Sequence, residues 1–256
     1  DENGAERINA FWDKPKAYFD KKASKKSSSL GSSDTLTPAV LAALALSRLA
    51  ASDVDEATKQ MNARWSRQLP QEWANWTWMQ LGRQAAFKLD DKANSHFAHG
   101  FKGNKSKDKN NFAISDDTWA WMARSALRGA NGEGQWSRVQ DAIHQMSPES
   151  QQEPTWVYWK AHAQLATAKA GASGETQRTN ARAQLQSITN ALHYYSMLAA
   201  EDLGQAIGIP TKPMPPTVAE RSTVTALPGL NRGLQLIARG MRSEGEREWN
   251  FTLRGM

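Results

Sequence analysis

The sequence predicts an all-α fold: a right-handed superhelix, or solenoid, of stacked antiparallel helix pairs. After Asp34 the residues Ala, Leu, Gln and Arg predominate, and no run of β-branched residues shows the two-residue alternation of a strand. Capping residues and prolines mark one helix start after another. Aromatic residues that open successive helix pairs also recur at a nearly regular interval.

The helices of the first half can be placed from their caps and stops. Thr37 is a capping residue, and Pro38 occupies the first helical position of the helix that follows. Asp53 and Asp55 place acids in the first turn of the next helix, where they stabilise its positive end. In order, the expected helices are 39–50, 53–68, 70–87, 92–99, one between the Ser115 cap and the Asn131–Gly132 stop, and 133–146.

Proline, glycine and capping boxes divide the second half in the same way. Pro154 begins a helix, and the Gly171–Gly174 turn returns the chain. Thr217 and Ser243 are each followed three residues later by a glutamate, which is the spacing of a capping box. The expected helices are 154–169, 175–188, 190–207 with Gly208 and Pro210 as its stop, one from Thr217, 227–241, and one from Ser243.

The helix pairs repeat at an interval that drifts. Trp78, Trp121, Trp159 and Tyr195 open successive pairs and stand 43, 38 and 36 residues apart. Spacings of about 34–47 residues are typical of helix-pair solenoids, whereas a strict tetratricopeptide array repeats every 34 or so. We therefore expect a degenerate tetratricopeptide-like domain over residues 35–256, preceded by a polar, lysine-rich segment over 1–34. Stacked pairs of this kind leave a curved inner surface.

Basic residues are in excess and unevenly placed. Lys and Arg number 32 against 26 acids, a net charge of +6. Lysines crowd 14–26 and 102–109 among Ser, Asn and Gly, which favours two mobile, solvated loops, with attraction to anionic polymers as the functional alternative. A nucleic-acid module would place its basic residues along a helix face or beside stacking aromatics. That pattern is absent, so we expect no nucleic-acid partner.

Composition also limits the chemistry and the location. With no cysteine, neither a disulfide nor a cysteine-ligated metal site is possible. The longest apolar run, Ala39–Leu46, is far shorter than the roughly 20 residues of a membrane span, so we expect none. The start at Asp1 lacks the features of a signal peptide, which indicates either that one has been removed or that the chain is a fragment.

Motifs for cofactor, metal or nucleophile chemistry are missing. The sequence holds no phosphate-binding GxxxxGK[ST], no GxSxG and no HExxH. His96 and His99 could share a helix face, but no third ligand follows at metal-binding spacing, and we interpret them as exposed polar residues. We therefore expect no cofactor and no metal.

Tryptophan is abundant, with 11 copies. Trp76 and Trp78 stand two residues apart, as do Trp119 and Trp121. Residues two apart on a helix point about 200° apart, so one tryptophan of each pair must lie off the buried stripe. The simplest interpretation is packing between helix pairs, and Trp156 with Trp159 fits the core best. The functional alternative is a wall of aromatic rings on which sugars stack. The candidates for this substrate binding are Trp76, Trp78, Trp119, Trp121, Tyr194 and Tyr195.

Four blocks carry a resemblance to a known family. The first is the segment 190–210, with an aromatic pair, Leu-Ala-Ala-Glu-Asp-Leu-Gly and a proline stop. The second block combines Trp119–Arg128 with Trp136–Met146. The third is the helix sequence Trp156-Val-Tyr-Trp-Lys-Ala-His-Ala163. The fourth is Glu244–Asn250. In this order the blocks resemble the superhelical, non-catalytic portion of soluble lytic murein transglycosylases.

The resemblance implies a periplasmic cell-wall enzyme. Such enzymes cleave the β-1,4 bond between N-acetylmuramic acid and N-acetylglucosamine without water, and they leave a 1,6-anhydromuramoyl end. Their single catalytic glutamate lies in a Glu-Ser-x-aromatic motif of a lysozyme-like domain. The only Glu-Ser here, Glu149-Ser150, is followed by two glutamines, so we expect no catalytic residue in this chain and the catalytic domain outside it. The implied partners are peptidoglycan glycan strands and that catalytic domain.

A different class of protein also fits the pattern. A stand-alone helical-repeat adaptor would use the same stacked pairs to hold a protein partner in its groove. A Glu-Ser-x-aromatic helix later in the same reading frame would favour the enzyme over the adaptor. Binding of the chain to duplex DNA that weakens as salt is raised would be needed to support a nucleic-acid partner.

Overall fold

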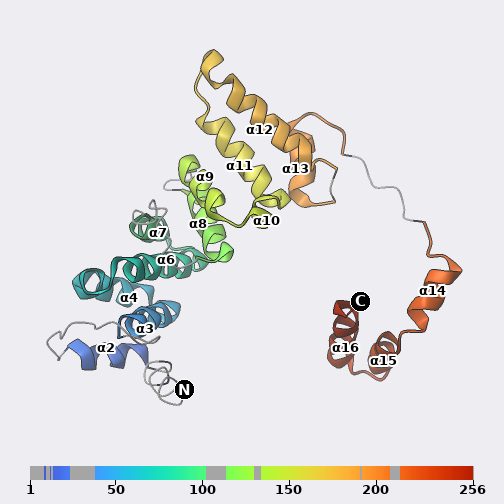
Figure 1. Cartoon of the computed structure of the whole chain (residues 1–256), viewed down its shortest axis with the longest axis horizontal. Helices are drawn as coiled ribbons and strands as arrows, with labels where there is room; N and C mark the ends of the chain where they lie inside the picture. The colour runs from blue at the N-terminus through green and yellow to red at the C-terminus, as the bar shows by residue number, and fades with distance from the viewer. Residues whose placement is uncertain are drawn as a thin grey trace. The chain divides into compact units, whose positions relative to one another are not determined.

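The computed structural model describes residues 9, 12, 14–23, 38–101, 114–129, 134–190, 192–207 and 214–255. Every regular element among these residues is helical, and neighbouring helices pack in pairs, which confirms the predicted all-α stack of helix pairs (Figure 1). The contacts divide the chain into two units, residues 1–207 and 208–256. In the described part of the chain, no helix has the length and apolar character that a membrane crossing requires.

The first unit begins with a core built largely from alanine and leucine. Helix α3 (Pro38–Ser52) is buried along most of its length because small Ala side chains let neighbouring helices approach it from several sides. Asp53, expected in the first turn of the following helix, instead caps it by accepting a hydrogen bond from the Glu56 N–H at 2.9 Å. The elements are α2 (Pro15–Ala23), α3 (Pro38–Ser52), α4 (Val54–Gln60), a π-helical turn (Met61–Trp65) and α5 (Ser66–Gln68).

The expectation of a loop over residues 14–33 needs correction. Residues 15–23 form α2, and Phe19 is only 2% exposed, packed edge-on against Trp65 with 5.7 Å between ring centroids. Phe19 and the neighbouring Tyr18, which packs against the same apolar cluster, dock this lysine-containing helix. Residues 24–37, which include the expected domain boundary at 34, lie outside the described residues, as does the lysine-rich segment 102–113.

The next two helix pairs are antiparallel and tightly packed. A Cβ on Gly82 would lie 2.7 Å from the Phe97 ring, and one on Gly100 would lie 2.8 Å from Met79. Since the later residue of α7 meets the earlier residue of α6, the two helices run in opposite directions. Ser115 caps α8 as predicted, accepting from the Thr118 N–H. The elements are α6 (Gln71–Phe87), α7 (Ala93–Phe101), α8 (Asp116–Arg128) and α9 (Trp136–Gln145).

The stack continues through a last pair and one further helix. The last pair is α11 (Pro154–Thr167) with α12 (Glu175–Ile188), and α13 (Tyr194–Asp202) follows it. The two helices of each pair, α6/α7, α8/α9 and α11/α12, pack against each other. Between pairs, α3 contacts α6, α6 contacts α8, α9 contacts α11, and α11 contacts α13. Three apolar clusters run through this series and share helices α6 and α11, so the core is continuous along the stack. The elements are α10 (Pro148–Gln151), α11 (Pro154–Thr167), a 3-10 turn (Gly171–Gly174), α12 (Glu175–Ile188) and α13 (Tyr194–Asp202).

The second unit holds a short helix and a close helix pair. Thr217 and Glu220 form the predicted capping box at the start of α14. The box predicted at Ser243 is wrong: α16 already begins at Arg242, and the Ser243 hydroxyl donates to its neighbour Glu244. Glycines on α15 face α16, which allows close contact of the two helices. The elements are α14 (Val218–Thr225), α15 (Pro228–Ala238) and α16 (Arg242–Arg254).

Candidate functional site

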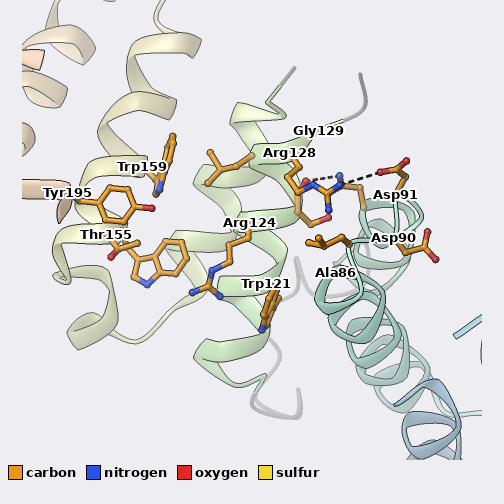
Figure 2. Close-up of a pocket in the computed structure, with 15 residues that line it drawn as sticks. Ala86, Asp90, Asp91, Trp121, Arg124, Arg128, Gly129, Thr155, Trp159 and Tyr195 are labelled. Carbon is orange, nitrogen blue, oxygen red and sulfur yellow. Dashed lines mark hydrogen bonds and ion pairs between the residues drawn. The ribbon is translucent and has the colours of Figure 1, made fainter. Parts of the chain in front are cut away.

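A pocket of about 310 Å³ opens in the first unit where three successive layers of the stack meet (Figure 2). The end of α6 and the turn before α7 form one side, α8 forms the floor, and α11 with the start of α13 forms the other side. Its lining residues are Ala86, Leu89, Asp90, Asp91, Asn94, Trp121, Arg124, Ser125, Leu127, Arg128, Gly129, Thr155, Trp156, Trp159 and Tyr195.

Arg124 is the central cation of the pocket. Its guanidinium carbon lies 5.0 Å from the ring centroid of Trp121 and 5.3 Å from that of Trp156, so an indole lies on each side of it. Trp121 and Arg124 are three residues apart on α8 and therefore share one face of that helix. Such cation–π contacts hold the side chain extended and oriented. Figure 2 shows Arg124 reaching into the middle of the pocket.

Carboxylates stand on the α6–α7 side of the pocket. Asp91 lies 3.9 Å from Arg128 of α8, with the aspartate almost fully exposed. Asp90 accepts a hydrogen bond from the Lys92 N–H at 2.9 Å, which shapes the turn that precedes α7. Leu89 adopts a positive φ of 60° in this turn, a conformation that non-glycine residues rarely take. The pocket therefore has an acidic side and a cationic centre.

Aromatic rings form the opposite side. The ring centroids of Trp159 and Tyr195 lie 5.9 Å apart at an interplanar angle of 67°, and both rings are half-buried. Behind them, His162 and Asp202 join α11 to α13 at 2.8 Å. Burial, reinforced by a hydrogen bond to Asp202, raises the pKa of Tyr158 above its ordinary value, which keeps this phenol neutral. In Figure 2 the Tyr195 hydroxyl points toward the centre of the pocket.

Polar contacts fix the floor. The Asn94 side-chain amide donates to the Ser125 carbonyl at 2.9 Å, and Arg138 donates to the Asn94 carbonyl at 2.9 Å. These two bonds tie the start of α7 to α8 and α9. The Asn94 Oδ1 atom is buried and has no hydrogen-bond partner within the described part of the chain. The floor is thus held in place from three helices.

The six candidate sugar-stacking residues separate into three groups. Trp121 and Tyr195 line the pocket. Trp78 and Trp119 are only 5% and 3% exposed, so their faces are occupied by the core and not open to a sugar. Trp76 and Tyr194 lie away from the pocket; Trp76 packs edge-on against Trp73, and Tyr194 is 63% exposed. The expectation that one tryptophan of each two-apart pair leaves the buried stripe is confirmed, since Trp76 and Trp121 are half-buried.

Apart from Trp121 and Tyr195, the lining residues were not predicted from the sequence, and Arg124 and Trp159 are the most important of those missed. Arg124 carried a local signal, because it follows Trp121 by one helical turn. Trp159 was assigned to the core, and it does contact two of the apolar clusters, yet part of its ring reaches the pocket. Trp156 is 4% exposed, which confirms its assignment to the core, while its ring makes a cation–π contact with Arg124.

The histidine pair differs from the expectation of two exposed side chains. His99 is exposed, but His96 is only 4% exposed, and both imidazoles stack on the Trp78 ring. Burial lowers the pKa of His96, so the neutral imidazole is favoured, consistent with its contact to the Thr58 hydroxyl. No group of three or more potential metal ligands occurs among the described residues. Glu149 lies exposed on the short helix α10 and does not line the pocket.

Comparisons with known proteins establish similarity at the level of the fold. No protein-family model matches the chain, and no curated protein sequence matches it. Among solved structures, the chain is similar to an inactive mutant of the lytic transglycosylase Slt from Pseudomonas aeruginosa, with a TM-score of 0.61 and 19% sequence identity. The match covers 99% of this chain and 37% of that one. The chain thus spans just over a third of the length of this structural neighbour.

Proposed function

We propose that this chain is the superhelical, non-catalytic part of a periplasmic lytic transglycosylase acting on peptidoglycan. The observation that carries the proposal is the likeness in fold to a lytic transglycosylase over 99% of the chain. Four sequence blocks in the family's order support it, namely 119–146, 154–163, 190–210 and 244–250. The parent enzyme would cleave the bond between N-acetylmuramic acid and N-acetylglucosamine and form a 1,6-anhydro product.

Within that enzyme the role of this chain is to bind and position a polymer. Chemistry of this kind needs a carboxyl group whose pKa is raised in an apolar pocket. Glu149 is exposed at a helix start, which is the opposite environment. The catalytic glutamate is therefore assigned to a lysozyme-like domain outside the chain, and the helical stack supplies a basic wall along which glycan strands lie.

Exposed apolar side chains in the second unit favour one alternative, an adaptor that holds a protein partner. Leu234, Ile237 and Met241 are exposed on or next to α15, and Phe251 and Leu253 are exposed on α16. Where exposed apolar side chains form one contiguous patch, they often mark a protein-binding face.

The protein encoded by the entire reading frame provides the test. Incubated with purified peptidoglycan, it should release 1,6-anhydromuropeptides that mass spectrometry detects, and the isolated 256-residue chain should release none. Glu149→Gln in the full protein should leave the rate unchanged. Absence of anhydro products from the full protein would favour the adaptor, and loss of turnover in a folded Glu149→Gln protein would place the active site in this chain.

A further inference from the structure

We propose that the pocket between α6, α8 and α11 binds a single N-acetylhexosamine residue that carries a carboxylate on its substituent, and that Arg124 pairs with this carboxylate. The inference rests on the proposed function for the identity of the polymer. It adds a defined subsite on the scaffold, with a residue that distinguishes one sugar of the strand from the other.

The cation is available and already oriented. None of the carboxylates in the described part of the chain forms an ion pair with Arg124, and its side chain is exposed. The two indoles of Trp121 and Trp156 hold the guanidinium in place. A guanidinium presents a planar pair of N–H donors that matches a carboxylate, and prior orientation lowers the entropy lost on binding. An anionic group is the natural partner for this side chain.

The walls suit a sugar ring. Half-buried aromatic surfaces of Trp159 and Tyr195 face the pocket, and sugars pack their C–H faces on such rings. A volume of about 310 Å³ lies at the lower end of the range of small-molecule sites, roughly 300–1,000 Å³. This size fits one sugar residue with its substituent and is too small for a longer segment of the polymer.

The charged side chains of the pocket determine how the ligand is oriented within it. Asp90 and Asp91 repel a carboxylate from the α6–α7 side, and Asp91 is partly balanced by Arg128. Hydroxyl or amide donors of the sugar would face these acids, with the carboxylate toward Arg124. The arrangement therefore favours a ligand that has donors at one end and a carboxylate at the other.

In a glycan strand the carboxylate can have two sources. It is the free lactyl group of a muramic acid residue that has lost its peptide, or it belongs to the stem peptide attached to that lactyl group. N-acetylmuramic acid represents the first source, and N-acetylmuramoyl-L-alanyl-D-glutamic acid represents the second. N-acetylglucosamine shares the ring and the acetamido group but has no carboxylate, so it serves as the reference ligand.

The test is a titration of the 256-residue chain with these three sugars, followed through the indole Nε1–H resonances of Trp121, Trp156 and Trp159 and by calorimetry. At least one carboxylated sugar should bind about tenfold more tightly than N-acetylglucosamine, the factor expected for one charge-assisted contact. Arg124→Gln should abolish this preference, so that the three sugars bind with equal affinity. Arg124→Lys should retain part of the preference, because it keeps the charge and loses the planar fork.

Arg67→Gln is the matched control. It removes the same charge from an exposed position on α5, outside the pocket, so it separates a defined site from general attraction to a basic protein. The control should bind all three sugars as the unmodified chain does. Equal affinity of the unmodified chain for all three sugars, or an unchanged preference in Arg124→Gln, would overturn the proposal. Failure here, with the chain still bound to intact peptidoglycan, would leave the proposed function standing.

Discussion

At the scale of the residue, small side chains decide how closely the helices approach. Gly82 on α6 faces the ring of Phe97 on α7, and Phe97 is fully buried. The sequence showed a glycine within a helix, where it costs about 1 kcal/mol relative to alanine. Only the structure shows why that cost is accepted, because a Cβ at this position would lie 2.7 Å from the ring.

Gly82→Ala should therefore destabilise the protein in spite of its better helix propensity. Overpacking a core typically costs about 1–3 kcal/mol and the propensity gain is about 1 kcal/mol, so we expect a net loss of up to about 2 kcal/mol. Denaturant unfolding followed by circular dichroism measures it. In the double variant Gly82→Ala/Phe97→Leu the loss should be smaller than the sum of the two single losses. Strict additivity would mean that the two side chains do not collide.

A second residue-scale effect is a carboxylate that joins α8 to α10. Asp116 accepts from the Ser147 hydroxyl at 2.6 Å, from the Ser147 N–H at 2.8 Å and from the Ser150 hydroxyl at 2.9 Å. These bonds favour the charged form and lower the pKa of Asp116 below its ordinary value of 3.8. Its contribution to stability is thus present above about pH 4 and is lost as the pH falls through the lowered pKa.

Asp116→Asn should cost on the order of 1 kcal/mol at neutral pH, because Oδ2 is replaced by a group that cannot accept from the two serine hydroxyls. The difference between the variant and the unmodified chain should shrink as the pH falls below about 4 and through the lowered pKa of Asp116, because protonation removes the carboxylate that accepts these bonds. Unfolding free energies of the variant and the unmodified chain at pH 7 and pH 3 measure the loss at neutral pH and its decrease in acid. Asp141→Asn, at an exposed site on α9, is the control and should show little effect at either pH. A difference that grows on acidification would contradict the assignment.

At the scale of the element, caps predicted helix starts well and packing decided the exceptions. Ser115 and Thr217 each cap the helix that their sequence position indicated, and Asp53 caps the helix in whose first turn it was expected. Ser243 does not, because the helix begins before it at Arg242. Helix α2 was missed because its docking depends on Phe19 and Tyr18 packing against the core of the following helices, a tertiary contact that local pattern does not reveal.

The capping box of α14 gives a prediction for a whole element. Helix α14 buries none of its side chains, so its N-terminal cap carries much of its stability. Thr217→Ala should weaken the helix by about 0.5–2 kcal/mol and speed amide hydrogen exchange across 218–225. Thr223→Ala, an exposed threonine within the same helix, should leave exchange unchanged or slow it, since alanine favours helices. Equal acceleration in both variants would show that the cap does not hold the helix.

At the scale of the whole molecule, the drifting aromatic interval was enough to predict a stack of helix pairs. The pocket could not be predicted, because its walls come from residues 86–195, and their meeting depends on how three layers pack. Two of the six sequence candidates line it, whereas the buried rings of Trp78 and Trp119 show that spacing alone does not tell a core ring from an exposed one.

The central claim is that this helical stack is a peptidoglycan-binding scaffold. Sedimentation of the purified 256-residue chain with intact peptidoglycan sacculi tests it most directly, because insoluble sacculi carry bound protein into the pellet. The chain should pellet with sacculi in a saturable manner, and bovine serum albumin should remain in solution. Binding should weaken as salt is raised, in keeping with a basic protein on an anionic polymer. A chain that stays in the supernatant at every sacculus concentration would contradict the account.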